Sequence, residues 1–242
     1  MRKVLMMFSL LACLRACCAG LLVLAIARAD ASVVMNNTRV IYAGGGTGES
    51  LQFRSSSEQP DIVQVWLDSG DPASTPMTAD APFIATPQIF RIEPDAGQTV
   101  HLMYTGRTPA ADRETLYYLN FSQLPAMKDE GPDSSRLILM FNSRLKVFYR
   151  PQGLEAPPAD LAGELRLQRE GDVLRVHNPT PYHVVVRSAE LLSPPGEHEL
   201  AESELIAPFS HTLWRLPAAG ESLRLVLVND YGADAISVLD LP

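Results

Sequence analysis

Short runs of apolar residues alternate with turn residues along most of the chain after residue 31. The first seven runs cover residues 32–42, 49–55, 61–67, 83–92, 99–104, 114–121 and 136–151. Valine, isoleucine, tyrosine and phenylalanine are common in them, and glycine and proline lie between them, as expected for β-strands and turns. No run has the apolar spacing of a long amphipathic helix. About seven strands over about 120 residues predict an immunoglobulin-like sandwich.

The pattern is interrupted after Arg150. Pro151 and Gly153, followed by the Ala-Pro-Pro-Ala segment at residues 156–159, predict a linker. Six further β-rich runs follow, at residues 165–169, 173–178, 183–191, 212–216, 223–229 and 235–239. We therefore expect an all-β protein of two immunoglobulin-like β-sandwich domains, residues 32–152 and 153–242, joined by a short hinge with an interdomain cleft.

The run at residues 136–151 reads RLILMFNSRLKVFYRP and begins with five apolar residues in succession after its first arginine. Successive side chains of a strand point to opposite faces, so both faces of this segment are apolar. Such a strand needs cover on both sides. One interpretation is a central strand that the chain's own second sheet covers. The other is a strand that a partner protein covers.

Residues 1–31 have a different pattern from the rest of the chain. Arg2 and Lys3 precede a long apolar run that ends on small residues. This arrangement predicts a secretory signal peptide that is cleaved between Ala29 and Ala31, and a location in the periplasm or outside the cell. Because the run is long and contains Arg15, an uncleaved membrane anchor is the alternative.

The cysteine positions and the net charge exclude several classes of function. Cys13, Cys17 and Cys18 all lie in the predicted signal peptide, so the mature chain has no disulfide and no thiol chemistry. Without that segment the chain has 16 basic and 27 acidic residues, against 20 and 28 in the whole sequence. This acidic balance argues against nucleic acid or an anionic membrane as the partner.

The sequence gives no indication of catalysis. It has no Gly-x-Ser-x-Gly nucleophile motif. No two histidines have the i, i+2 or i, i+4 spacing of a metal-binding pair among His101, His177, His183, His198 and His211. We therefore expect no enzymatic activity, no cofactor, no metal site and no small-molecule substrate.

Two basic residues lie inside apolar runs. Arg39 is in the segment TRVIY, and Lys146 lies between Leu145 and Val147. They either point to solvent on edge strands, where charges deter unwanted strand pairing, or face a cleft as an anion site. The residues alone leave both interpretations open.

Six segments, in the same order over both domains, carry a family resemblance. They are residues 38–42 (TRVIY), 85–94 (ATPQIFRIEP), 112–120 (DRETLYYLN), 146–151 (KVFYRP), 178–182 (NPTPY) and 228–232 (VNDYG). With them the chain resembles the periplasmic pilus-assembly chaperones of the bacterial chaperone/usher pathway. The resemblance implies a chaperone that binds pilin subunits and delivers them to an outer-membrane usher.

In that family the pilin lacks one strand of its sandwich, and the chaperone lends its own. By resemblance, Leu137, Leu139 and Phe141 share the donated face, and Ile138 and Met140 are expected to pack inward on the chaperone. Burying three such side chains contributes about 5 to 9 kcal/mol before the cost of association is subtracted. An exposed strand of this kind also favours self-association of the free chain.

The resemblance also implies roles for charged residues. Arg39 and Lys146 match the anchor for the C-terminal carboxylate of the subunit, which sets the register of the donated strand. Lys146 has the opposite parity to the donor residues, so either a bulge intervenes or the two sites use different faces. Glu114, Arg150 and Asp230 match an ion-pair network between the domains.

The expected usher contact is less fully matched. Ile62, Gln64 and Thr86 occupy positions of the family's contact surface, but Gln88 stands where a second proline is common. The alternative function is a secreted adhesion or binding module of two immunoglobulin-like domains, in which the apolar strand is internal.

Overall fold

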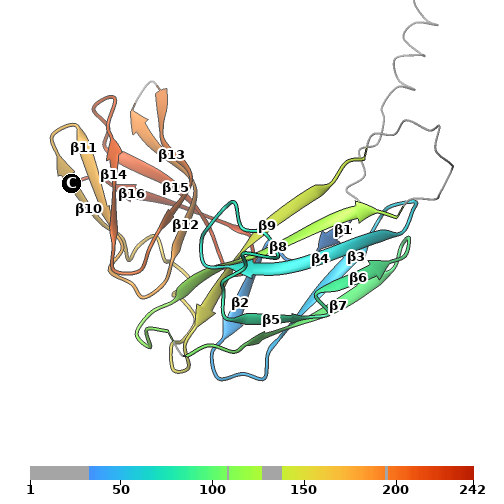
Figure 1. Ribbon diagram of the computed structural model, residues 1–242. Helices are drawn as coiled ribbons and strands as arrows, with labels where there is room; N and C mark the ends of the chain where they lie inside the picture. The colour runs from blue at the N-terminus through green and yellow to red at the C-terminus, as the bar shows by residue number, and fades with distance from the viewer. Residues whose placement is uncertain (1–32, 108, 127–137, 194–195) are drawn as a thin grey trace, which may run out of the picture. The chain divides into compact units, whose positions relative to one another are not determined.

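The computed structural model describes residues 33–107, 109–126, 138–193 and 196–242 (Figure 1). Every regular element in these ranges is a β-strand. In this part of the chain no helix has the length and apolar character needed to cross a membrane. The predicted signal peptide lies outside the described residues.

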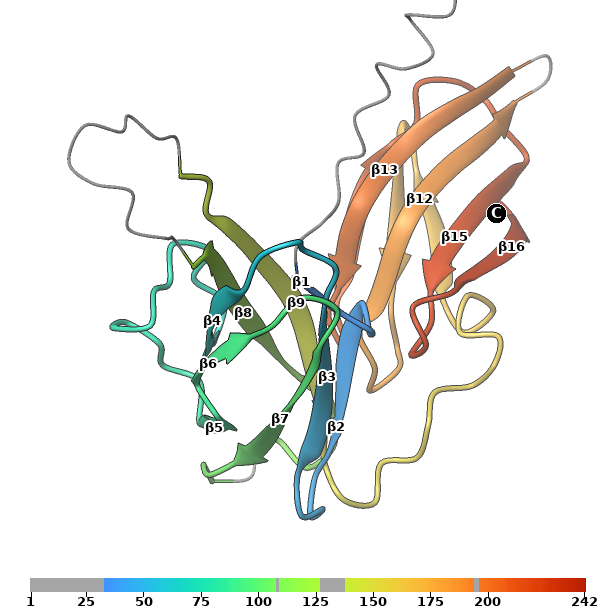
Figure 2. The same ribbon diagram turned by 90° about the vertical axis from the view of Figure 1, so that its right-hand side faces the viewer.

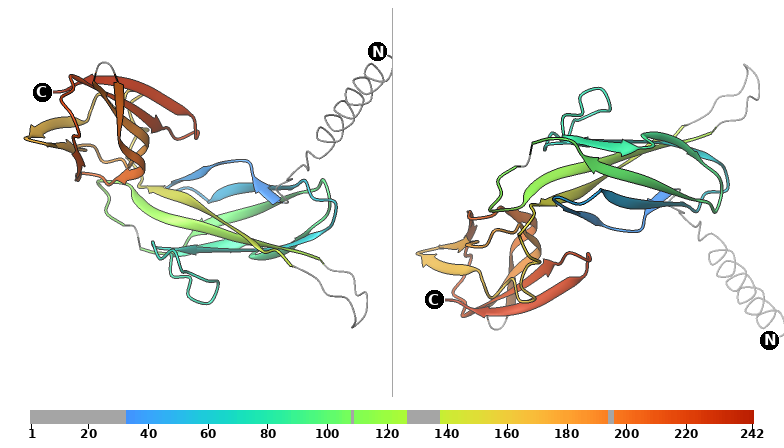
Figure 3. Two further views of the ribbon diagram at one scale, coloured as in Figure 1. Left: turned by 90° about the horizontal axis from the view of Figure 1, so that it is seen from above. Right: turned by 90° about the horizontal axis from the view of Figure 1, so that it is seen from below.

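The N-terminal sandwich consists of nine strands in two sheets. They are β1 (Val33–Met35), β2 (Arg39–Ala43), β3 (Glu49–Ser55), β4 (Asp61–Asp68), β5 (Phe83–Thr86), β6 (Ile89–Ile92), β7 (Gly97–Tyr104), β8 (Thr115–Pro125) and β9 (Phe141–Arg150). One sheet has the order β1-β3-β7-β5 and the other the order β2-β9-β8-β4-β6. Figure 3 shows these two layers of the sandwich edge-on.

Two predicted strands are each divided between the two sheets. Residues 32–42 form β1, which pairs with β3, and β2, which runs parallel to β9. Asn36, Asn37 and Thr38 separate them, and these residue types favour turns. Residues 83–92 form β5 and β6, separated by Pro87 and Gln88, because proline cannot donate to a sheet.

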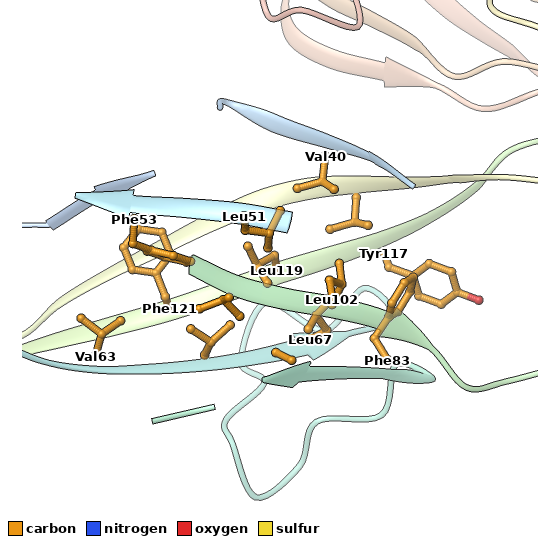
Figure 4. Packing of buried hydrophobic residues seen from close by; sticks show 14 of the residues in the cluster. Val40, Leu51, Phe53, Val63, Leu67, Phe83, Leu102, Tyr117, Leu119 and Phe121 are labelled. Carbon is orange, nitrogen blue, oxygen red and sulfur yellow. The ribbon is translucent and has the colours of Figure 1, made fainter. Parts of the chain in front are cut away.

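Alternating residues of both sheets fill the core of this sandwich (Figure 4). Phe53 of β3 meets Phe90 and Phe121 edge-on, with ring centroids 5.6 and 5.2 Å away. Leu102 and Leu119 are fully buried between the layers. The apolar faces of the two sheets therefore cover each other, which positions β9 by its buried second half.

The C-terminal sandwich consists of seven strands. They are β10 (Arg166–Glu170), β11 (Val173–His177), β12 (Val184–Ser193), β13 (Gly196–Ile206), β14 (His211–Arg215), β15 (Ser222–Val228) and β16 (Asp234–Asp240). One sheet has the order β10-β11-β14. The other has the order β13-β12-β15-β16, and its strands are labelled in Figure 2. Trp214, Leu174 and Leu225 are buried between the two sheets.

Strand β13 was not among the predicted elements. Its sequence, GEHELAESELI, carries four glutamates, and most of its side chains are exposed or half-buried. It lies at the edge of its sheet and pairs only with β12 among the described strands. An edge strand with little apolar alternation resembles a polar loop in sequence, which explains the omission.

Candidate functional site

The segment at the start of β9 exposes apolar side chains in succession. The exposed fractions are 46% for Ile138, 55% for Leu139, 59% for Met140 and 55% for Phe141. The prediction that Ile138 and Met140 pack inward is therefore wrong: β9 begins at Phe141, and the residues before it extend beyond the sheet. Leu137 lies outside the described residues.

The same part of β9 has a free edge. On one side β9 pairs with β8 along its length, from Gln123↔Phe141 to Thr115↔Tyr149. On the other side β2 pairs only with residues 146–150. Residues 141–145 therefore have a neighbouring strand on one side only, among the strands that the structure describes (Figure 1). A free edge presents unpaired N–H and C=O groups on which another strand can form.

The pairing of β8 with β9 is continuous, so no bulge interrupts β9. Phe141 lies on the same face as Val147, which is part of the core, and Lys146 lies on the opposite face. Of the two alternatives that parity left open, the structure has no bulge, and Phe141 and Lys146 lie on different faces of one regular strand.

Arg39 and Lys146 are register partners on the parallel strands β2 and β9. Arg39 donates from Nη1 to the carbonyl oxygen of Val228 at 2.9 Å, while its buried Nε has no hydrogen-bond partner in the described structure. Lys146 is half-buried and forms no ion pair with any described residue. Two cations thus lie side by side without a carboxylate in contact.

Burial and neighbouring charges shift the pKa of both Lys146 and Arg39. Burial, and then the positive charge of Arg39, lower the pKa of Lys146 below its ordinary value. Burial also lowers the pKa of Arg39, although the carboxylate of Asp230 opposes this. An anion placed between the two groups would relieve their repulsion and satisfy the free Nε.

A hollow adjoins Arg39. Phe148 of the N-terminal sandwich and Tyr182, Val185 and Leu227 of the C-terminal sandwich contribute to its lining. Arg39 therefore borders a partly apolar cleft, in which a charge interaction is screened less than at an open surface.

Arg150, four residues after Lys146, is fully paired. Its Nη2 lies 2.7 Å from Glu114 Oε1, and its Nη1 lies 3.0 Å from Asp230 Oδ2. The exposed side-chain fractions are 10% for Arg150 and 3% for Glu114. Glu114 precedes β8 and Asp230 follows β15, so this network links the two sandwiches.

Glu114 has a further partner that the sequence did not reveal. Its Oε2 accepts a hydrogen bond from the backbone N–H of His183 at 2.8 Å, and His183 Nδ1 lies 3.3 Å away. Burial raises the pKa of Glu114, but the hydrogen bonds from His183 and Arg150 outweigh this and hold it below its ordinary value. The only sequence signal was that His183 directly follows the NPTPY segment.

Arg144 is a second residue that the sequence analysis missed. Its guanidinium makes two hydrogen bonds to the carboxylate of fully buried Asp68, at 2.6 and 2.7 Å, and lies 4.0 Å from the centroid of the Tyr118 ring. Asp68 also accepts from Asn120 Nδ2. The cluster fixes β9 to β8 and β4 between the apolar segment and Lys146.

The three expected usher-contact residues come from both sheets of the N-terminal sandwich. Ile62 and Gln64 lie on the same face of β4, where Ile62 pairs with Leu124 and Gln64 with Ile89. Thr86 is the last residue of β5, in the other sheet. Ile62, Ile89 and Leu124 are exposed, so the apolar part of this surface includes two residues that were not predicted.

The fold and this arrangement define a protein-binding protein built of two immunoglobulin-like sandwiches. Among the described residues it offers a free sheet edge with apolar side chains, beside two adjacent cations, neither of which has a carboxylate in contact. Within the described ranges no three His, Cys, Asp or Glu side chains are grouped to hold a metal.

Family models match both halves of the chain. Residues 32–155 match the pili and flagellar-assembly chaperone, PapD N-terminal domain, and residues 160–236 match the pili assembly chaperone PapD, C-terminal domain. The chain belongs to this family of pilus-assembly chaperones.

Individual relatives agree with this assignment. The chain is 34% identical over 210 residues to the chaperone protein FimB/FhaD of Bordetella pertussis, covering 84% of this chain and 86% of that protein. It is similar to the crystal structure of the YadV chaperone, with 32% identity and a TM-score of 0.73 over 87% of this chain and 100% of that one. It also matches a chain of the Salmonella enterica SafA pilin–SafB chaperone complex, with 27% identity, a TM-score of 0.74, and coverage of 89% and 99%.

The protein is thus a periplasmic pilus-assembly chaperone and not an enzyme. The predicted family and the predicted fold class, two immunoglobulin-like sandwiches, are both confirmed.

Proposed function

We propose that this chaperone binds pilin subunits by donor-strand complementation and delivers them to an outer-membrane usher. Residues 1–31 are the signal peptide that is removed on export, residues 32–152 form the chaperone domain that donates the strand, and residues 153–242 form the second domain. The single observation that carries the proposal is the free edge of β9 at residues 141–145, together with the exposed apolar residues that precede it.

Strand donation between chaperones and pilins is an established form of β-augmentation. A pilin strand that pairs with residues 141–145 would satisfy the free N–H and C=O groups of β9. Phe141 and Leu139, with Leu137 before them, would then fill the core positions of the incomplete sandwich. Each side chain contributes about 1.5 to 3 kcal/mol when it is fully buried, before the ordering cost of association.

Arg39 and Lys146 anchor the C-terminal carboxylate of the subunit. Their adjacency in register, the free Nε of Arg39 and the absence of a carboxylate partner for Lys146 among the described residues support this role. A carboxylate held by both groups fixes where the subunit begins along β9. Register then decides which side chains enter the subunit.

Two further roles belong to this proposal. The network of Glu114, Arg150 and Asp230 holds the two domains in the orientation that binds the subunit. The surface of β4, with Ile62 and Gln64, contacts the usher, and Thr86 extends that surface from the neighbouring sheet. The exposed apolar residues on the same face support an interaction surface there.

Co-expression with a pilin in the periplasm tests the proposal. Phe141→Asp and Leu139→Asp place charges on the donated face, and we expect both to abolish recovery of the chaperone–pilin complex. Ile236→Asp is the matched control, because Ile236 is 69% exposed on β16, in the other domain. Wild-type yields of complex from both donor variants would contradict the proposal and favour a binding module with a closed strand.

A further inference from the structure

Two histidines lie opposite each other on the outer face of the three-stranded sheet of the C-terminal sandwich. Strands β11 and β14 pair antiparallel, with His177 and His211 as register partners (Figure 1). Val176 of β11 and Trp214 of β14 are buried. Since side chains alternate along a strand, His177 and His211 both point away from the core.

The hydrogen bonds show which kind of pair this is. The backbone N–H of Asn178 donates to the carbonyl of Ser210 at 2.8 Å, so the next residues along both strands form a non-hydrogen-bonded pair. That pair is His177 and His211. In such pairs the Cα atoms are only about 4.5 Å apart and the side chains are closer than in hydrogen-bonded pairs.

One of the two rings makes a contact that suits metal binding. His177 Nδ1 lies 3.1 Å from the carbonyl oxygen of Ser210. A carbonyl oxygen only accepts, so this contact favours the neutral tautomer in which Nδ1 donates and the lone pair of Nε2 is free for a metal. Metal-binding histidines commonly donate their second N–H to a backbone carbonyl in this way. His211 is exposed, so its side chain can turn toward its neighbour.

We propose that His177 and His211 together bind a divalent first-row transition metal ion, with water in the remaining positions. Imidazole ligands suit Cu²⁺, Ni²⁺ and Zn²⁺, and Cu²⁺ is expected to bind most tightly. The pair shares no residue with the subunit-binding site. The two histidines are 34 positions apart in the sequence, which explains why spacing along the chain did not reveal the site.

Charged neighbours modulate the site. Arg166 of β10 is the register partner of His177 on its other side, and it opposes a bound cation. Arg175 on the same face is paired with Glu170 at 2.8 Å, which neutralises it. Arg166, His177 and His211 therefore form a row across β10, β11 and β14. The row contains two metal ligands and one cation.

Calorimetric titration of Ni²⁺ into the untagged mature chaperone tests this site. We expect one site, and an affinity loss of at least about tenfold in His211→Ala and in His177→Ala. His198→Ala, on β13, is the matched control and should bind like the wild type. Arg166→His replaces the opposing cation by a third imidazole in the same row, so its affinity should rise at least about tenfold.

Equal affinity in the wild type and in both alanine variants would overturn the proposal, as would absence of binding in the wild type, whatever Arg166→His does. If His177→Ala does not fold, because its ring bonds to Ser210, the exposed His211→Ala carries the test. Circular dichroism of the metal-free variants distinguishes loss of folding from loss of the site.

Discussion

Lys146 and Arg150 are two of the three cations on one face of strand β9, and their surroundings are opposite. Arg150 meets the carboxylates of Glu114 and Asp230 within 3.0 Å. Lys146 has another cation, Arg39, as its register partner and no carboxylate in contact among the described residues. A charge withdrawn from water is costly unless it is paired. Arg150 is therefore satisfied within the chain, whereas for Lys146 we propose that a bound anion supplies the missing charge.

Arg150 is expected to stabilise the folded chain, whereas Lys146 is expected to contribute to binding. Removing Arg150 leaves two carboxylates without their cation at a largely buried joint. Removing Lys146 takes away a repulsion and leaves no buried partner unsatisfied. The two substitutions should therefore affect the free energy of unfolding in different ways, although both remove one positive charge from one strand.

The largest effect is expected for Arg150→Ala. Breaking a buried ion pair by removing one partner typically costs about 3 to 5 kcal/mol, and both Glu114 and Asp230 lose their partner here. Urea unfolding of the variant and the wild type measures the difference in the free energy of unfolding.

The matched control is Arg175→Ala. Arg175 also pairs with a glutamate, Glu170, at 2.8 Å, but the two side chains are 32% and 43% exposed, so a smaller change in stability is expected. Equal losses of stability in Arg150→Ala and Arg175→Ala would show that burial of the Arg150 network does not matter.

Lys146→Ala should have the opposite profile. We expect its free energy of unfolding to match or slightly exceed that of the wild type, because the repulsion by Arg39 is removed. Its affinity for a peptide or pilin with a free C-terminal carboxylate should fall about tenfold to a hundredfold, as expected for a charged hydrogen bond of about 1.5 to 3 kcal/mol.

Lys146→Arg retains the charge and should retain most of the binding. An amidated C-terminus on the ligand should reduce binding to the wild type but not to Lys146→Ala. If amidation weakens binding to the wild type and to Lys146→Ala equally, Lys146 does not bind the carboxylate.

Arg39 and Lys146 also show how much of the site can be predicted from the sequence. Arg39 and Lys146 stand out because a charge inside an apolar strand is unusual, and that signal is local. Their adjacency depends on the parallel pairing of β2 with β9, which joins segments over 100 residues apart and follows only from the fold. The family resemblance supplied what the local pattern could not.

Residues that act through tertiary contacts left weaker signals. His183 reaches Glu114 from the other sandwich, and Arg144 on β9 reaches Asp68 on β4 across the intervening strand β8. Neither contact has a fixed spacing along the chain. Most strands were predictable because their apolar residues are buried on at least one face, whereas β13 is polar and lies at an edge.

The smallest expected effect is on the pH dependence of the free energy of unfolding, which distinguishes the Arg150 network from Lys146. The pKa of Glu114 in the folded chain lies below its ordinary value of 4.5, so the unfolded chain takes up this proton at a higher pH than the folded chain. The stability that Glu114 contributes is therefore fully present above pH 4.5 and is lost as the pH falls through the folded-state pKa. Unfolding free energies measured between about pH 5 and about pH 3 should fall more steeply for the wild type than for Glu114→Gln. Lys146→Ala, which leaves the Arg150 network intact, should retain the wild-type slope over this range, and parallel curves for the wild type and Glu114→Gln would contradict the assignment.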